Sequence, residues 1–199
     1  MDVEQFEFTS KKSLYSARLQ VRRTKTELGW LSQVEGVATV AILKKWTYAI
    51  WSESSHAGLV SQAEGTDRKN ISWQWQKQTQ GFEVRNRSSA QIREPKLNPV
   101  GVSDVLFLFN QLLREEATEL REVAVVFPVG SKFYAAALRI APNREEHAGI
   151  FCPAPDGSRE IDWQQGTSFT VKWNANQSAI TSIQTRHRVL GDLRLDLQV

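Results

Sequence analysis

The chain has 199 residues, of which 41% are hydrophobic and 24% are charged, an ordinary composition for a soluble protein with its own core. A net charge of +3, from 25 basic and 22 acidic residues, does not point to nucleic acid or to anionic lipid as a partner. One cysteine, Cys152, excludes an internal disulfide, and no run approaches the roughly 20 apolar residues of a membrane-spanning helix.

Strand-like alternation begins in SLYSARLQVRR, residues 13–23. Tyr15, Ala17, Leu19 and Val21 share one face of this segment, which is typical of a half-buried strand. GVATVAILKKWTYAIWS, residues 36–52, carries apolar groups on both faces, which predicts a strand covered on both sides.

A second group of strands follows. GLVSQAEG leads into the turn sequence GTDRKN, and ISWQWQK and GFEVRNR then form a predicted hairpin. In ISWQWQK, Ile71, Trp73 and Trp75 fall on one side, while serine and glutamine side chains fall on the other. The tryptophan side is therefore expected to be the dry one.

The middle of the chain predicts a polar loop near 86–101 and one helix near 103–116. Leu106, Phe109 and Leu113 recur at the spacing of a helix face. Ser103 is a plausible N-cap, and Asp104 lies where the helix dipole favours negative charge.

Strand signals resume in REVAVVFPVG, SKFYAAALRIA, SFTVKWN and GDLRLDLQV. Many short strands with turns between them, plus one helix, favour a mainly β protein that forms a single domain over residues 1–199. We expect a strongly curved antiparallel sheet or incomplete β-barrel, with the helix packed on it or plugging it. A two-sheet β-sandwich is the alternative.

The order of these elements resembles an uncharacterised bacterial envelope family, a domain of unknown function whose members are curved β-sheets or barrels. The resemblance covers roughly residues 13–199 and is carried by WTYAIWSESSHAGLVSQAEG, ISWQWQK, GVSDVLFLFNQLL and the closing FTVKWNANQSAITSIQTRHRVLGDLRLDLQV. It implies a non-catalytic role in the periplasm or cell envelope if a signal peptide has been removed. The N-terminus shows no such signal, and without that removal the cytoplasm is expected.

Catalytic and metal motifs are not apparent. The three histidines, His56, His147 and His187, are far apart in sequence, so neither a metal nor a cofactor is expected. The chain has no G-x-S-x-G, Walker A or dinucleotide-binding glycine pattern. An enzyme that uses Cys152 as a nucleophile with His147 close in space is a third hypothesis for the function.

The aromatic residues carry the leading functional hypothesis. They either fill a solid core or line a concave surface for an apolar or lipid-like molecule, or for an envelope protein partner. The candidate ligand-binding residues are Trp46, Tyr48, Trp73, Trp75, Phe169 and Trp173. The alternative is a nucleic-acid-binding module that uses the basic 85–96 loop, with Arg85, Arg87, Arg93 and Lys96 beside stacking rings, although nucleic acid is the less favoured partner.

Overall fold

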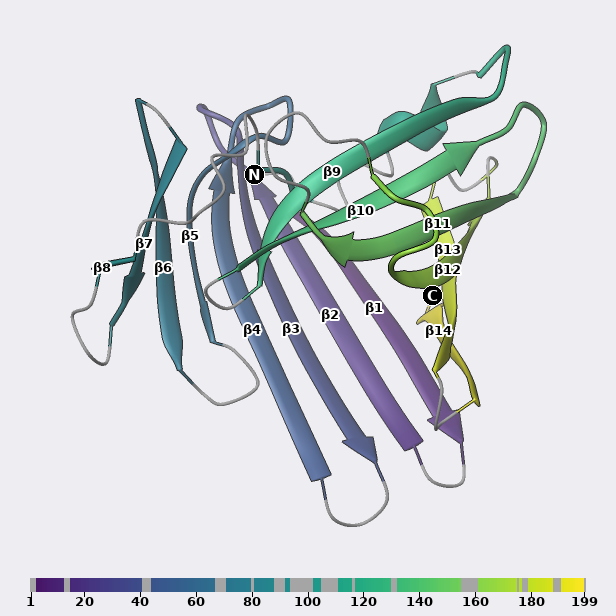
Figure 1. Ribbon diagram of the computed structural model, residues 1–199, viewed down its shortest axis with the longest axis horizontal. Coiled ribbons are helices and arrows are strands. Elements are labelled where there is room, and N and C mark those ends of the chain that lie inside the picture. Colours follow the sequence, from purple (N-terminus) through teal and green to yellow (C-terminus); the bar gives the residue numbers. More distant parts are fainter. Residues whose placement is uncertain are drawn as a thin grey trace.

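The alternating segments of the sequence become strands of one antiparallel sheet in a computed structural model of the protein (Figure 1). The structure describes residues 3–12, 15–40, 44–66, 71–79, 81–87, 92–93, 102–104, 111–115, 117–129, 132–154, 161–174, 176, 179–187 and 191–198. The strands are β1 (Val3–Lys12), β2 (Tyr15–Lys25), β3 (Trp30–Val40), β4 (Lys44–Ser54), β5 (Val60–Thr66), β6 (Ser72–Gln78), β7 (Gly81–Asn86), β8 (Ile92–Arg93), β9 (Arg121–Val129), β10 (Lys132–Ile140), β11 (Glu146–Pro153), β12 (Thr167–Asn174), β13 (Ala179–His187) and β14 (Gly191–Gln198).

The sheet has 14 strands in the order β8-β7-β6-β5-β4-β3-β2-β1-β14-β13-β12-β11-β10-β9. Neighbours in sequence are therefore neighbours in space, and the two halves of the chain are joined where β1 pairs with β14, with Phe8 opposite Leu197. Within the described strands, β8 and β9 end the order and do not pair with each other, so the sheet is open. The predicted curved antiparallel sheet is confirmed, and the sandwich alternative is wrong because there is one sheet.

The sheet bends back on itself, so that β9, β10 and β11 cross the long strands β1 to β4 (Figure 1). The buried apolar side chains of this curved sheet form two groups. The first, called here the tryptophan core, consists of Val60, Ala63, Trp73, Trp75, Phe82, Val84, Val102, Phe133, Ala135, Cys152 and Ala154. The second, called here the leucine core, consists of Phe8, Leu113, Val125, Ala136, Leu138, Ile140, Val171 and Ile180.

Strand β10 separates the two cores. Ala135 packs into the tryptophan core, whereas Ala136 and Leu138 pack into the leucine core. Successive side chains of a strand point to opposite faces, so a strand with a core on each side must be apolar at nearly every position. This arrangement explains the run of alanines in KFYAAALRI, which leave room for larger neighbours on both faces.

A short extended segment, residues 102–104, links the sheet across its open side. The N–H of Val60 donates to the carbonyl of Val102 at 2.6 Å, and the N–H of Ser103 donates to the carbonyl of Val126 at 2.7 Å. The N–H of Asp104 donates to the carbonyl of Gly58 at 3.0 Å. The 102–104 segment thus ties the beginning of β5 to β9.

These hydrogen bonds correct the predicted start of the helix. Ser103 and Asp104 are extended rather than helical, so the helix does not include these two residues. Their backbone groups bond to the sheet, and this non-local pairing replaces the local helix signal. The described helical residues are 111–114, and residues 105–110 of the predicted helix lie outside the described part of the chain.

The helix packs on the sheet, as predicted. Leu113 is buried in the leucine core, and Leu112 packs against its edge. The Nη2 atom of Arg121, at the beginning of β9, donates to the carbonyl of Leu112 at 2.6 Å and fixes the end of the helix. Of the predicted polar loop near 86–101, residues 86–87 and β8 are described, and residues 88–91 and 94–101 are not.

Candidate functional site

Trp73 and Trp75 lie on the inner face of β6 and are almost completely buried, with exposed fractions of 5% and 2%. Cross-strand register places Ala63 opposite Trp75, and both belong to the tryptophan core. Gln76, on the other face of β6, is exposed. The expectation that the tryptophan face of ISWQWQK is the dry one is therefore confirmed.

The other candidate aromatics lie in different parts of the fold. Trp46 lies in β4, where its backbone pairs with Ala38 of β3. The side chain of Trp46 is outside the described part of the structure. Tyr48 is partly buried on the same strand, and burial raises its pKa to about 12. Phe169 and Trp173 pack against the leucine core from β12.

The structure thus brings Trp73 together with Trp75, and Phe169 together with Trp173, but it places the two pairs in different cores. Phe169 has a specific packing role because its ring lies over Gly149, its cross-strand partner. A methyl group at position 149 would come within 2.4 Å of Phe169 Cζ. The role of the six residues in ligand binding stays a prediction.

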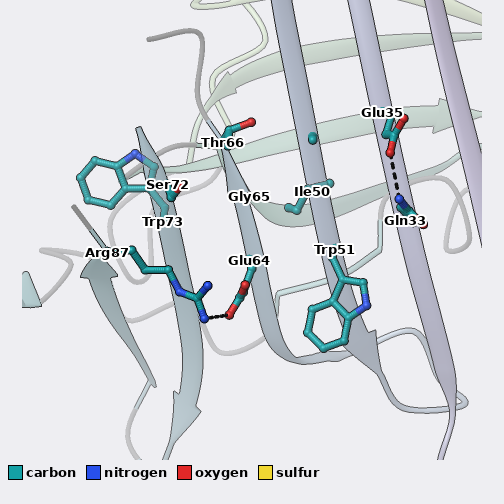
Figure 2. A pocket seen from close by; sticks show the side chains of 11 residues that line it. Gln33, Glu35, Ile50, Trp51, Glu64, Gly65, Thr66, Ser72, Trp73 and Arg87 are labelled. Atoms are coloured by element: carbon teal, nitrogen blue, oxygen red, sulfur yellow. Dashed lines mark hydrogen bonds and ion pairs between the residues drawn. The ribbon is translucent and has the colours of Figure 1, made fainter. Parts of the chain in front are cut away.

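A small pocket lies beside Trp51 on the outer face of the sheet (Figure 2). Trp51 stands between Gln33 and Glu64 in the register, and Arg87 Nη2 forms an ion pair with Glu64 Oε1 at 2.6 Å. The pocket volume is about 240 Å³. Because sites for drug-sized ligands usually measure about 300–1,000 Å³, this pocket is too small for such a ligand.

A larger cavity, of about 950 Å³, lies between the helix and the turn that joins β10 to β11. We call it the hairpin cavity. It is lined by Leu113, Arg114, Glu115, Ala117, Thr118, Ile140, Ala141, Pro142, Asn143, Arg144, Glu145, His147 and Trp173. One of the six candidate aromatics, Trp173, therefore lines it.

Local sequence shapes this cavity. Pro142 and Asn143 form the turn after β10, and Asn143 adopts a left-handed conformation, with φ of 55°, that asparagine tolerates better than most residues. The N–H of Trp173 donates to the carbonyl of Glu145 at 2.8 Å, which ties the turn to β12. The apolar side is formed by Leu113 and Ile140 of the leucine core.

Two buried polar atoms belong to residues that line the hairpin cavity. His147 has an exposed fraction of 3%, and its Nδ1 atom has no hydrogen-bond partner among the described residues. The Nε1 atom of Trp173 is likewise buried without a partner in that part of the chain. Both nitrogens have almost no accessible surface, so His147 and Trp173 border the cavity through other atoms.

The surroundings of His147 keep its imidazole neutral. Burial lowers its pKa, and a backbone hydrogen bond to Arg144 acts in the opposite, smaller sense. A neutral imidazole has one nitrogen that donates and one that accepts. The cavity is therefore bordered by a histidine whose neutral form is favoured by burial.

We expect the lowered pKa of His147 to make the protein less stable as pH falls below about 6.5, the ordinary value. Between the folded-state pKa and that value, the unfolded chain binds a proton that the folded chain does not. The free energy of unfolding therefore decreases as the pH is lowered through this range. Above about pH 6.5 the contribution is complete. Urea unfolding between about pH 5 and pH 7.5 measures this slope.

The matched variants for this measurement are His147→Gln and His56→Gln. His147→Gln should flatten the slope, and His56→Gln, at an exposed position, should keep it. The pKa values of the carboxylates of Glu7, Glu122 and Glu146 are lowered by their cationic partners, so these groups act below the chosen range. An unchanged slope in His147→Gln would assign the pH dependence to another group.

The Cys152–His147 hypothesis is wrong in its geometry. The two residues are five positions apart on β11, so their side chains point to opposite faces of the sheet. Cys152 lies opposite Ala135 in the tryptophan core, and His147 lies opposite Val171 of the leucine core. Burial raises the pKa of the Cys152 thiol, with Asp162 adding to the effect, which disfavours the reactive thiolate.

The basic 85–96 loop gives little support to nucleic-acid binding. Arg85 pairs with Glu83, and Arg87 pairs with Glu64, so these two cations face carboxylates. Arg93 lies in β8, where its backbone pairs with Val84 of β7, and Lys96 lies outside the described residues.

No group of three metal-ligating side chains gathers within the described ranges, and no helix there is long and apolar enough to span a membrane.

One buried polar cluster was missed at the level of sequence. Arg23, with an exposed fraction of 2%, pairs with Glu4 at 2.8 Å and lies 3.6 Å from Asp104 Oδ2. Ser32 donates to the same carboxylate, and the Arg23 guanidinium lies 4.3 Å from the centre of the Trp30 ring. The signal was present, because Arg23 falls on the same face of SLYSARLQVRR as Leu19 and Val21.

Comparison with known proteins supports the fold alone. No known protein family matches the sequence, and no curated protein matches it either. Among solved structures, the chain is similar to a beta-barrel-like protein of the domain of unknown function DUF1849 from Brucella abortus, with a TM-score of 0.61 and 7% sequence identity. The match covers 98% of this chain and 95% of that one. The chain therefore resembles a family of unknown function in its barrel-like fold, as the order of its elements predicted.

Proposed function

We propose that the protein is a non-enzymatic binding protein that takes an amphipathic, lipid-like small molecule in the hairpin cavity. The volume of about 950 Å³ falls within the range of pockets that enclose drug-sized ligands. Such pockets combine a mainly apolar lining with a few polar groups that orient the ligand. About half of the residues that line the hairpin cavity are apolar, and the others are polar or charged.

The observation that carries the proposal is an apolar wall in a cavity of this size. Leu113 and Ile140 supply the wall, and each is a buried residue of the leucine core. Trp173 adds to the apolar side, and Arg114, Thr118 and Arg144 supply polar groups of the lining. A molecule with an apolar body and a polar end fits a cavity with both kinds of lining.

What supports binding rather than catalysis is the placement of the titratable groups. His147 and Cys152 lie on opposite faces of β11, so they do not form a nucleophile and base pair. Arg144 and Glu145 at the rim are exposed to solvent. Trp73 and Trp75 are packed in the tryptophan core. The cavity lined by Trp173, rather than the surface of these two rings, is therefore the proposed binding space for a ligand.

The cavity can be blocked without disturbing the sheet. Ala117 lines the cavity and is partly buried, so Ala117→Phe places a ring in the proposed binding space. Ala124→Phe adds the same ring at an exposed position on β9 and serves as the control. Binding of dodecanoate and of the fluorophore 8-anilinonaphthalene-1-sulfonate is measured by calorimetry and by fluorescence.

We expect Ala117→Phe to weaken binding of both probes by about tenfold or more, which corresponds to about 1.4 kcal/mol, and Ala124→Phe to leave it unchanged. Native mass spectrometry of protein from its own host should also show a co-purifying small molecule. Equal binding by the wild type and both variants would place the probes elsewhere and overturn the proposal. Absence of binding by the folded wild type would overturn it too.

A further inference from the structure

We propose that the outer face of the sheet carries a second binding site, the pocket of about 240 Å³ beside Trp51, and that it takes one ring of a neutral saccharide. This site is separate from the hairpin cavity and goes beyond the proposed function, so its test does not depend on that function. The feature that marks it is a partly buried tryptophan among polar side chains.

Trp51 lies in the middle of a row of side chains that crosses three strands. Its cross-strand partners are Gln33 on β3 and Glu64 on β5. Residues directly opposite in antiparallel strands point to the same face, with Cβ atoms about 4.5–5.5 Å apart. Figure 2 shows the indole next to Glu64, which Arg87 contacts. The ring is therefore flanked by hydrogen-bonding groups on both sides.

A small residue in the next row leaves the hollow beside the indole. Ala49 lies two positions before Trp51 on β4, so both side chains point to the same face. The partners of Ala49 in the register are Glu35 on β3 and Thr66 on β5, which have longer side chains. All four residues line the pocket. A six-membered ring over Ala49 would therefore contact the indole.

The polar groups of the pocket are already held in place. Gln33 Nε2 donates to Glu35 Oε1 at 2.8 Å, and Arg87 Nη2 pairs with Glu64 Oε1 at 2.6 Å (Figure 2). Within the described residues, each carboxylate uses its Oε1 atom in these contacts, so its Oε2 atom is available to a ligand hydroxyl. Groups that are oriented before binding lose less conformational entropy when a ligand arrives.

The charges of the pocket favour a neutral ligand. The lining has two carboxylates, Glu35 and Glu64, and one guanidinium, Arg87, which is paired with Glu64. An anion would therefore meet an excess of negative charge. A cation without hydroxyl groups would leave the amide of Gln33 and the hydroxyl of Thr66 unused.

A sugar ring has the two kinds of surface that this pocket offers. Its C–H groups form an apolar face that packs on the electron-rich face of an aromatic ring. Its hydroxyl groups both donate and accept, so they match carboxylates, an amide and hydroxyls alike. A single sugar ring is also smaller than the drug-sized ligands for which this pocket has too little room.

The test uses ligands that differ in charge. Cellotetraose, maltotetraose and chitotetraose are neutral, tetragalacturonate is an anion, and tetramethylammonium is a cation with no hydroxyl group. In nitrogen-15 spectra of the full chain, we expect at least one neutral tetrasaccharide to move the indole N–H signal of Trp51, which is identified by its absence from Trp51→Phe. Neither charged probe should bind more tightly than that sugar by calorimetry.

Two variants locate the bound sugar. Trp51→Ala removes the ring, and Ala49→Leu fills the hollow while it keeps the ring, so each should weaken binding by about tenfold or more. Ala124→Leu makes the matched change at an exposed position on β9 and is the control. Ala117→Phe, which blocks the hairpin cavity, should bind the sugar as the wild type does.

Four results would overturn the saccharide site. They are an unmoved Trp51 signal with all three neutral sugars, tighter binding of a charged probe at Trp51, equal sugar binding by Ala49→Leu and Ala124→Leu, and loss of sugar binding in Ala117→Phe. The last of these would place the sugar in the hairpin cavity. If Ala49→Leu does not fold in urea-unfolding measurements, the Trp51 signal of the wild type still decides the question.

Discussion

Replacement of Asp104 by asparagine is expected to lower the free energy of unfolding by about 3 kcal/mol, because it leaves the buried Arg23 cation short of a counter-charge. Asp104 has an exposed fraction of 8%, and its Oδ2 atom lies 3.6 Å from Arg23 Nε and accepts a hydrogen bond from Ser32. Glu4 still pairs with Arg23 in the variant, which sets the effect at the low end of the usual 3–5 kcal/mol.

The same change should loosen the 102–104 segment. Asp104 is the last residue of that segment, and its N–H bonds to Gly58 while its side chain bonds to β3. Hydrogen exchange at the Ser103 and Asp104 amides should therefore become faster in the variant than exchange in β2 and β3. Loss of this contact weakens the hydrogen-bonded link that the 102–104 segment makes between the beginning of β5 and β9.

Two further variants make the Asp104 measurement decisive. Glu7→Gln removes one partner of the solvent-screened Arg18–Glu7 pair, at 2.7 Å, and should leave the free energy of unfolding measured in urea nearly unchanged. Arg23→Met combined with Asp104→Asn should recover part of the loss, because an apolar side chain then replaces a buried cation that has lost one of its two carboxylate partners. Equal losses of stability for Asp104→Asn and Glu7→Gln would contradict the prediction that the buried Arg23–Asp104 pair stabilises the fold more than the Arg18–Glu7 pair does.

The alternation of side chains made the fold predictable as far as one curved antiparallel sheet. Period-two patterns identify a strand and its dry face, and neighbours in sequence then pair, as in β6 and β7. Strand β1 (Val3–Lys12) was not predicted, because Glu4 falls on the inner face, where the alternation of a half-buried strand normally has an apolar residue. The structure supplies the reason, since Glu4 pairs there with Arg23.

The start of the helix was unpredictable for a related reason. Ser103 followed by Asp104 before an apolar run is a typical helix start, and these residues instead bond to Val126 and Gly58. Val126 lies 23 residues after Ser103, and Gly58 lies 46 residues before Asp104, so a local motif does not indicate either partner. Non-local contacts of this kind commonly override helix propensity. The helix itself, with Leu113 buried, was correctly expected.

The candidate site was predictable only in part. Alternation places Trp73, Trp75, Phe169 and Trp173 on dry faces, and it cannot tell which of two cores each face meets. The hairpin cavity depends on how the helix and the β10–β11 turn stand beside β12, which is a non-local property. The sequence suggested His147 as a base for Cys152, and the register of β11 places the two side chains on opposite faces of the sheet.

Trp75→Ala is expected to lower the free energy of unfolding by about 3–5 kcal/mol, the usual cost of removing a large aromatic from a core. The exposed fraction of Trp75 is 2%, and its neighbours in the tryptophan core include Phe82, Val84 and Cys152. Urea unfolding measures the loss. Gln76→Ala, on the exposed face of the same strand, should change stability by less than about 0.5 kcal/mol.

Trp75→Phe separates the contribution of the ring from that of its polar atom. The Nε1 atom of Trp75 is buried without a hydrogen-bond partner among the described residues, and such an atom costs about 1–3 kcal/mol. Phenylalanine removes that cost while it keeps most of the apolar contact, so its loss should be much smaller than that of alanine. If Trp75→Ala were instead nearly neutral and weakened ligand binding, Trp75 would be a wall of a binding site, because a side chain in a solid core cannot be removed without a loss of stability.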